Sequence, residues 1–144
     1  MAVLATNYAC LKGRLIMLKG CLILADSHHE MLGGMRSLLA PLFSTTVMVS
    51  DENSLLTIAG QVQPDLIVVD LSLPVSSQVN IARRLKTKFP ESKFIILSIY
   101  DDHAAINECL EAGACGFVLK RAAVTDLLPA AEAVMRGETY VSSV

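Results

Sequence analysis

The residues best suited to chemistry each follow a short apolar run of the sequence. Asp26, Asp70, Ser98 and Lys120 stand directly after such runs. The two carboxylates offer the hard oxygen ligands that Mg²⁺ prefers, the lysine offers a point charge for an anionic oxygen, and the serine offers a hydroxyl donor. Phosphoryl transfer depends mainly on positioning and charge neutralisation, so this set suits that reaction. A carboxylate can also be the nucleophile and form an aspartyl phosphate, a role we assign to Asp70.

The apolar runs that precede these residues predict buried strands. Strands covered on both faces of a parallel sheet are continuously apolar rather than alternating. A fifth, β-branched stretch is less apolar and is expected nearer an edge of the sheet. The predicted strands are residues 21–25, 43–49, 66–69, 94–97 and 116–119.

Between the strands, apolar residues recur at helical spacing. They predict five helices, within residues 31–42, 55–62, 81–89, 105–110 and 127–135. We expect Asp101 or Asp102 to cap the fourth helix and Gly113 to end it, and we place Pro129 in the first turn of the fifth. Close packing is the expected reason for the Gly33-Gly34 pair inside the first helix.

Five strands that alternate with five helices predict an α/β fold with a doubly wound parallel sheet and right-handed crossovers. In such sheets, ligands bind outside the carboxyl ends of the strands. The topology therefore brings the four polar residues to one edge, and the site is predicted there.

Composition excludes several other classes of protein. The chain has 144 residues, enough for one domain, and its longest apolar segment is broken by Lys19, so no membrane span is expected. A net charge of −2 leaves no basic surface for nucleic acid. The four cysteines show no Cys-x-x-Cys spacing, which favours a reducing cytoplasm over a disulfide framework.

Five segments resemble the successive landmarks of response regulator receiver domains. They read LILADSHHEMLGGMRSLL, PDLIVVDLSLP, ILSIYDD, GACGFVLK and DLLPAAEAVMRGETYVS, in the family's order and spacing. The last is most similar to the NarL/FixJ (LuxR-type) branch. The resemblance implies a flavodoxin- or CheY-like (βα)5 fold over residues 19–138, with an N-terminal extension at 1–18 and the start of a C-terminal linker at 139–144.

The resemblance also implies a non-enzymatic switch in two-component signalling. Its partners would be a sensor histidine kinase and a second copy of the chain, and DNA would be contacted only through an output domain absent from this chain. Residue by residue, it implies these roles: Asp70 as phosphoacceptor, Lys120 as phosphate-binding lysine, Ser98 as the hydroxyl that turns toward the phosphoryl group, Phe117 as the aromatic switch, and Asp26, Asp70 and the backbone carbonyl of Ser72 as Mg²⁺ ligands.

One position departs from the family pattern. Ser27 stands where the second acid of the metal pair is expected, and a hydroxyl brings no charge to the cation. We expect Mg²⁺ affinity to fall about ten- to a hundredfold. A pseudo-receiver that signals without phosphate is therefore the alternative function. A haloacid-dehalogenase-type phosphatase would be a further alternative, but that class needs an aspartate two residues after its nucleophile. Ser72 occupies that position, which argues against such an enzyme.

Three further expectations concern residues around the site. His28 and His29 are interpreted as residues at the start of a helix rather than as metal ligands. A strand-end lysine contributes little stability, so Lys120 is expected to matter for phosphate more than for folding. The loop at 74–78 lacks the glycine common there in the family.

Overall fold

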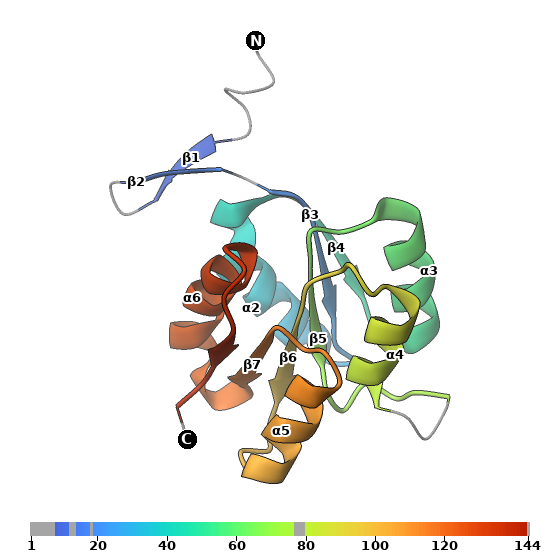
Figure 1. Cartoon of the computed structure of the whole chain (residues 1–144). Coiled ribbons are helices and arrows are strands. Elements are labelled where there is room, and N and C mark those ends of the chain that lie inside the picture. The colour runs from blue at the N-terminus through green and yellow to red at the C-terminus, as the bar shows by residue number, and fades with distance from the viewer. Residues whose placement is uncertain (1–7, 12–13, 18, 77–79, 144) are drawn as a thin grey trace.

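The computed structural model of the chain shows one parallel sheet covered by helices on both faces (Figure 1). It describes residues 8–11, 14–17, 19–76 and 80–143. The elements run in the order β1 (Tyr8–Leu11), β2 (Arg14–Met17), β3 (Lys19–Ala25), α2 (His29–Leu39), η1 (Ala40–Leu42), β4 (Phe43–Val49), α3 (Glu52–Val62), β5 (Leu66–Asp70), α4 (Ile81–Lys88), β6 (Phe94–Ser98), α5 (His103–Glu111), β7 (Gly116–Leu119), η2 (Lys120–Ala122), α6 (Ala123–Met135) and β8 (Tyr140–Val141).

The six-stranded sheet has the order β4-β3-β5-β6-β7-β8, and all its neighbouring strands are parallel. The predicted α/β doubly wound fold and its five strands are confirmed. Every residue of β5 and β6 is buried, as their continuous apolar runs predict. β4 lies at the edge and is partly exposed, also as predicted.

Alternate residues of the central strands serve two separate cores. Ile67 and Val69 of β5 pack with α3, α4 and α5 on one face. Leu66 and Val68 pack with α2 and α6 on the other. Successive side chains of a strand point to opposite faces, so each strand holds both helical layers in place.

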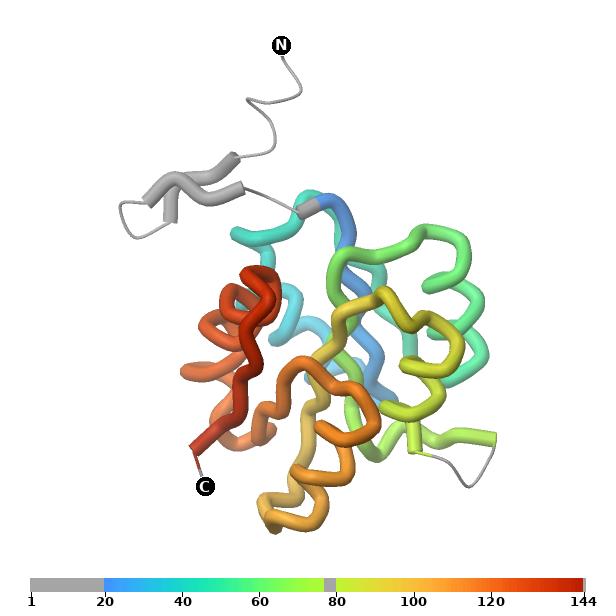
Figure 2. Tube along the Cα trace, in the orientation of Figure 1, coloured from blue at the N-terminus to red at the C-terminus, as the bar shows by residue number. Residues whose placement is uncertain are grey.

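The sixth strand, β8, lies within the range predicted to start a linker. Gly116 pairs with Tyr140 and Phe117 with Val141, so the C-terminal segment runs beside β7 (Figure 2). Ser142 follows the strand and is buried; its hydroxyl donates to Asp126 of α6 at 2.7 Å and accepts from the Leu119 N–H at 3.1 Å. The domain boundary at residue 138 stays a prediction, but the sheet extends beyond it.

Helix ends follow the sequence signals closely. Asp102 caps α5 by accepting from the Ala105 N–H, and Gly113, at φ 112°, follows the helix in the left-handed region that glycine tolerates. Asp51 and Asn80 cap α3 and α4 in the same way.

Two expectations about helix interiors are wrong. Pro129 is not in a first turn: α6 begins at Ala123, directly after η2, so the proline lies at its seventh residue. Gly33 and Gly34 are exposed, and a Cβ on either would meet nothing within 4 Å, so close packing does not explain them.

The segment before the domain forms its own small sheet. β1 and β2 pair antiparallel within the range predicted as an N-terminal extension, and the six-stranded sheet does not include them. Among the described residues, no helix combines the length and apolar character needed to cross a membrane.

Candidate functional site

The four polar residues singled out in the sequence lie at one edge of the sheet, at the carboxyl ends of four strands. Asp26 follows β3, Asp70 ends β5, Ser98 ends β6 and Lys120 follows β7. Ala25 is in register with Val69 and Ser98 with Leu119, so the parallel pairing sets these ends side by side. The predicted convergence at this edge is what the structure shows.

Lys120 bridges the two acids. Its Nζ lies 2.9 Å from Asp70 Oδ2 and 3.2 Å from Asp26 Oδ2. Both carboxylates are buried, and the lysine side chain is only 14% exposed. Three charges are therefore held together away from bulk water, and Lys120 is not a solvated strand-end residue.

This contact shifts the pKa values of both partners. Burial acts to raise the pKa of Asp70, but the hydrogen bonds from Lys120 and Ser72 outweigh it and hold that pKa below its usual value. Burial acts to lower the pKa of Lys120, and the hydrogen bonds and charges of the two acids raise it instead. At neutral pH the site therefore contains an ionised Asp70 and a cationic Lys120.

Ser72 supports Asp70 in a way that the sequence analysis did not anticipate. Its backbone N–H donates to Asp70 Oδ1 at 3.1 Å, and its hydroxyl donates to Oδ2 at 2.9 Å. Only its backbone carbonyl was considered as a ligand. An aspartate with a serine two residues later is a common turn signal, and that signal could have suggested the contact.

His28 joins the site beside Asp26. It is the N-cap residue of α2, as expected of a residue at a helix start, and its backbone N–H donates to Asp26 Oδ1 at 2.9 Å. Its ring Nδ1 lies 2.9 Å from the same oxygen. No spacing rule pointed to this contact, because it depends on how the chain turns between β3 and α2.

Ser98 and Phe117, the predicted hydroxyl donor and aromatic switch, are both buried. The Ser98 hydroxyl is buried and accepts from the Tyr100 N–H at 2.9 Å, so it is engaged with its own loop. Phe117 is fully buried in the core on the α3, α4 and α5 side of the sheet. Its carbonyl accepts from the Ser142 N–H, which ties it to the C-terminal segment.

The loop after Asp70 is anchored by a buried acid. Glu52, the first residue of α3, accepts from the N–H and the hydroxyl of Ser76 and from Arg84 Nε at 3.3 Å. Burial acts to raise the pKa of Glu52, but these donors outweigh it and lower that pKa. Of the loop at 74–78, positions 77 and 78 lie outside the described residues.

The donor set fits a divalent cation. Asp26 is fully buried, and its Oδ2 lies 3.2 Å from the ammonium of Lys120. The buried carboxylates of Asp26 and Asp70 are hard oxygen donors of the kind that Mg²⁺ prefers. Ser27 is exposed and adds no charge to the pocket.

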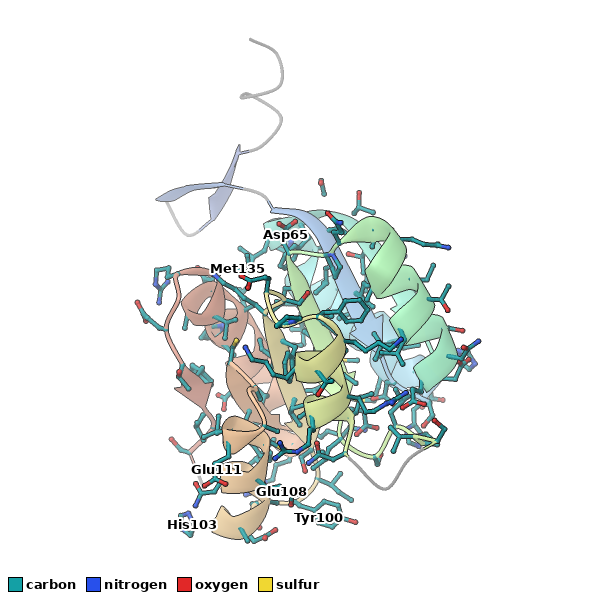
Figure 3. The ribbon with its side chains drawn as sticks, turned by 45° about the vertical axis from the view of Figure 1, so that its right-hand side comes forward. Asp65, Tyr100, His103, Glu108, Glu111 and Met135 are labelled. Carbon is teal, nitrogen blue, oxygen red and sulfur yellow. The ribbon has the colours of Figure 1, made fainter. Side chains whose placement is uncertain are left out.

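A surface hollow elsewhere on the domain is not this site. It is lined by residues that include Asp65, Phe89, Lys93 and Met135. Figure 3 shows Asp65 and Met135 at the opposite end of the sheet from Tyr100, which lies just beyond Ser98. The acids and the lysine are therefore at the carboxyl edge, where α/β sheets bind ligands, and the hollow is at the other.

Known proteins match the chain over most of its length. The family model of the response regulator receiver domain matches residues 22–132. The transcriptional regulatory protein DegU of Brevibacillus brevis is 28% identical over 122 residues, which are 83% of this chain and 52% of that protein. The oxygen regulatory protein NreC of Staphylococcus haemolyticus is 41% identical over 80 residues, 55% of this chain and 37% of that protein. The chain thus spans less than two thirds of either relative.

A solved structure shares the fold. The isolated receiver domain of RcsB from Salmonella enterica serovar Typhimurium, determined in the presence of the phosphomimetic BeF3−, matches with a TM-score of 0.79 at 24% identity. The match covers 88% of this chain and 94% of that one. The described sheet and its two helical layers are therefore those of a receiver domain.

Proposed function

Because the chain belongs to the response regulator receiver domain family, we propose that it is a phosphorylation switch that accepts a phosphoryl group on Asp70. The chain is a receiver domain of a two-component response regulator of the NarL/LuxR type. The proposal adds the chemistry: transfer from a sensor histidine kinase, supported by Mg²⁺.

One observation carries this proposal. Lys120 holds the carboxylates of Asp70 and Asp26 together at the carboxyl edge of the sheet, and all three side chains are largely buried. Burying a cluster of charges costs desolvation free energy, which only well-placed partner charges and hydrogen bonds offset. A site that stabilises an incoming phosphoryl group needs these charges in these places.

Each residue has a distinct part in the transfer. Asp70 is ionised and attacks phosphorus, so a bond forms between its carboxylate oxygen and phosphorus while the bond from phosphorus to the donor breaks. Lys120 would stay with Asp70 and neutralise the phosphoryl oxygens. The Ser98 hydroxyl accepts from the Tyr100 N–H and keeps its own hydrogen to donate to one of those oxygens. Phe117, buried in the core beside β6, would adjust when the phosphoryl group binds.

Mg²⁺ would be held by Asp26, Asp70 and the backbone carbonyl of Ser72. When bound, it supplies positive charge that offsets the phosphoryl oxygens and the acids. Without the acid at position 27, the site holds Mg²⁺ about ten- to a hundredfold more weakly than a full acid set would.

The partners follow from the same proposal. A sensor histidine kinase donates the phosphoryl group, a second copy of the chain pairs with the phosphorylated form, and DNA is reached only through an output domain. Such a switch works in the cytoplasm and is not an enzyme.

Intact-mass measurement with acetyl phosphate tests the proposal. The wild-type chain should gain one phosphoryl mass in Mg²⁺ and lose that gain in EDTA, while Asp70→Asn should gain none. Equal labelling of both proteins would exclude Asp70 as the acceptor.

The alternative is a pseudo-receiver that signals through its surface alone. It is favoured by Ser27, which is exposed and neutral, and by Lys120, which already neutralises the acids without a metal. If the wild-type chain takes no label at saturating Mg²⁺ and Ser27→Asp restores labelling, the pseudo-receiver is the correct function.

A further inference from the structure

The turn that carries Lys120 is closed by a residue from the C-terminal end of the domain. Lys120 is the first residue of η2, which joins β7 to α6. The Ser142 hydroxyl accepts from the N–H of Leu119, directly before this turn, at 3.1 Å. The same hydroxyl donates to Oδ2 of Asp126, in the first turn of α6, at 2.7 Å. One hydroxyl group therefore connects the two ends of the segment that holds Lys120.

Ser142 occupies a built position in the fold. It is only 3% exposed, and its backbone N–H donates to the carbonyl of Phe117 at 2.9 Å. The segment before it runs back past α6 and pairs with β7 (Figure 2). A Cβ at Gly116 of β7 would meet Ile95 Cγ1 at 3.0 Å and the Tyr140 carbonyl at 3.5 Å, so a side chain there would crowd the sheet where β8 joins it. Both the backbone N–H and the hydroxyl of Ser142 are thus engaged.

The two helices at this turn have no capping side chain of their own. α3, α4 and α5 are each capped by the side chain of the residue before them. Leu119 precedes η2 and Ala122 precedes α6, and neither makes a side-chain cap hydrogen bond. Backbone groups at a helix start need partners from outside the helix. Ser142 supplies, from a distant part of the chain, a side-chain contact that these helix starts lack.

Lys120 depends on a fixed backbone at this turn. Its ammonium lies 2.9 Å from Asp70 and 3.2 Å from Asp26, and both distances must be kept for it to bridge the two acids. A lysine side chain carries its charge on a flexible four-carbon stem. A shift of the Lys120 backbone therefore changes which of the two carboxylates the ammonium can reach.

We propose that Ser142 is a positioning residue for Lys120, and that the C-terminal strand therefore forms part of the phosphorylation site. The Ser142 hydroxyl fixes Leu119 and Asp126 relative to each other, and the turn between them then places the lysine between its two acids. The effect on phosphoryl transfer rests on the proposed function, whereas the placement of Lys120 can be measured without a phosphoryl donor.

Nuclear magnetic resonance of the 144-residue chain with ¹³C-labelled lysine tests the placement. The εCH₂ signal of Lys120, identified by its absence in Lys120→Ala, should lie outside the range of exposed lysines in the wild type. In Ser142→Ala it should move more than halfway toward that range. Ser143→Ala is the matched control at an exposed position and should leave the signal in place. Ile67→Val, which removes a methyl group from the buried core, controls for a loss of stability alone and should leave it in place as well.

The rate of labelling by acetyl phosphate at saturating Mg²⁺ measures the consequence for the site. Ser142→Ala should slow the gain of phosphoryl mass about three- to thirtyfold, because a small displacement of a positioned group is costly for the transfer. Asp126→Ala should slow labelling to a similar degree. Asp126→Asn should stay within about twofold of the wild type, since its amide oxygen can still accept from the Ser142 hydroxyl. Ser143→Ala and Ile67→Val should label at the wild-type rate.

Several results would overturn the inference. A Lys120 signal that stays in place in Ser142→Ala, or that moves equally in Ile67→Val, would show that the hydroxyl does not place the lysine. So would a wild-type labelling rate in Ser142→Ala, or an Asp126→Asn variant that labels as slowly as Asp126→Ala. Failure of the proposed function gives a different result: the wild type takes no label, while the Lys120 signal still depends on Ser142. In that case the positioning role stands and the phosphoacceptor does not.

Discussion

Removing the amino group of Lys120 should destabilise the domain, because two buried carboxylates lose the cation between them. The ammonium lies 2.9 Å from Asp70 and 3.2 Å from Asp26. At an effective dielectric near 20, each pair is worth about 5 kcal/mol before desolvation is subtracted. The loss of stability cannot reach the sum of the two pair energies, because one carboxylate can take up a proton when the lysine is absent. Near pH 7 that proton costs about 4 kcal/mol, at about 1.4 kcal/mol for each pH unit above an ordinary aspartate pKa.

We therefore expect Lys120→Ala to lower the free energy of unfolding by about 2–4 kcal/mol near pH 7. In the wild type the folded-state pKa of Asp70 is lowered, so its contribution to stability is present above the unfolded pKa and is lost as pH falls. In the variant, burial acts on Asp70 without the opposing lysine and raises its pKa, so stability falls as pH rises. The two proteins should differ most at neutral pH and converge near pH 4.

Urea unfolding followed by circular dichroism, at several pH values, measures this difference. Lys88→Ala is the control for an exposed lysine and should unfold like the wild type. Adding Asp70→Asn to Lys120→Ala should recover part of the loss, because one buried charge is removed. A Lys120→Ala variant with wild-type stability across the pH range would refute the reasoning.

Three further predictions use substitutions elsewhere in the domain. Ser27→Asp should tighten Mg²⁺ binding about ten- to a hundredfold, measured by a titration of the thermal midpoint, and should destabilise the metal-free protein. If the response to Mg²⁺ is unchanged, the missing charge is not what limits Mg²⁺ affinity. Gly33→Ala and Gly34→Ala should each stabilise the domain by about 0.5–1 kcal/mol in urea unfolding, since the added methyl meets nothing, and a loss would point to a contact that the structure does not contain. Ser142→Ala should lower the free energy of unfolding by about 1–3 kcal/mol, because the Leu119 N–H and the Asp126 carboxylate lose their hydrogen-bond partner. Ser143→Ala, at an exposed position, should leave stability unchanged. Equal effects of the two substitutions would show that the Ser142 hydroxyl does not hold the C-terminal segment in place.

The strands could be predicted because a strand that is buried on both faces is a continuous apolar run in the sequence. The runs before Asp26, Asp70, Ser98 and Lys120 are apolar throughout, and the strands end within a residue of where those runs end. A doubly wound topology then determines which edge carries the polar residues. The convergence of the site follows from topology and needs no knowledge of side-chain contacts.

Features that depend on a few tertiary contacts could not be predicted. β8 has only two residues and is held in place by its pairing with β7 and by the buried hydroxyl of Ser142. Neither contact produces a periodic pattern in the sequence. Pro129 was assigned to a first turn on the propensity of isolated helices. In the structure η2 leads directly into α6, so the helix begins earlier and encloses the proline.

Tertiary contacts within the site could not be predicted from the sequence either. Residue types suggested what Lys120 and Asp70 could do, but not that the lysine would be buried between two acids, which changes its expected contribution to stability. His28 was interpreted as a residue at a helix start, which it is, yet the turn after β3 also brings its ring to Asp26. Such contacts are set by loop geometry over two or three residues.

Borohydride reduction after labelling tests the central claim most directly. The chain would be treated with acetyl phosphate and Mg²⁺ and reduced, and its peptides would be mapped by mass spectrometry. An acyl phosphate on Asp70 is reduced to homoserine, so the account predicts homoserine at position 70 and unreduced aspartate at position 26. Homoserine at another position, or at none while Mg²⁺ saturates the pocket, would contradict Asp70 as the phosphoacceptor.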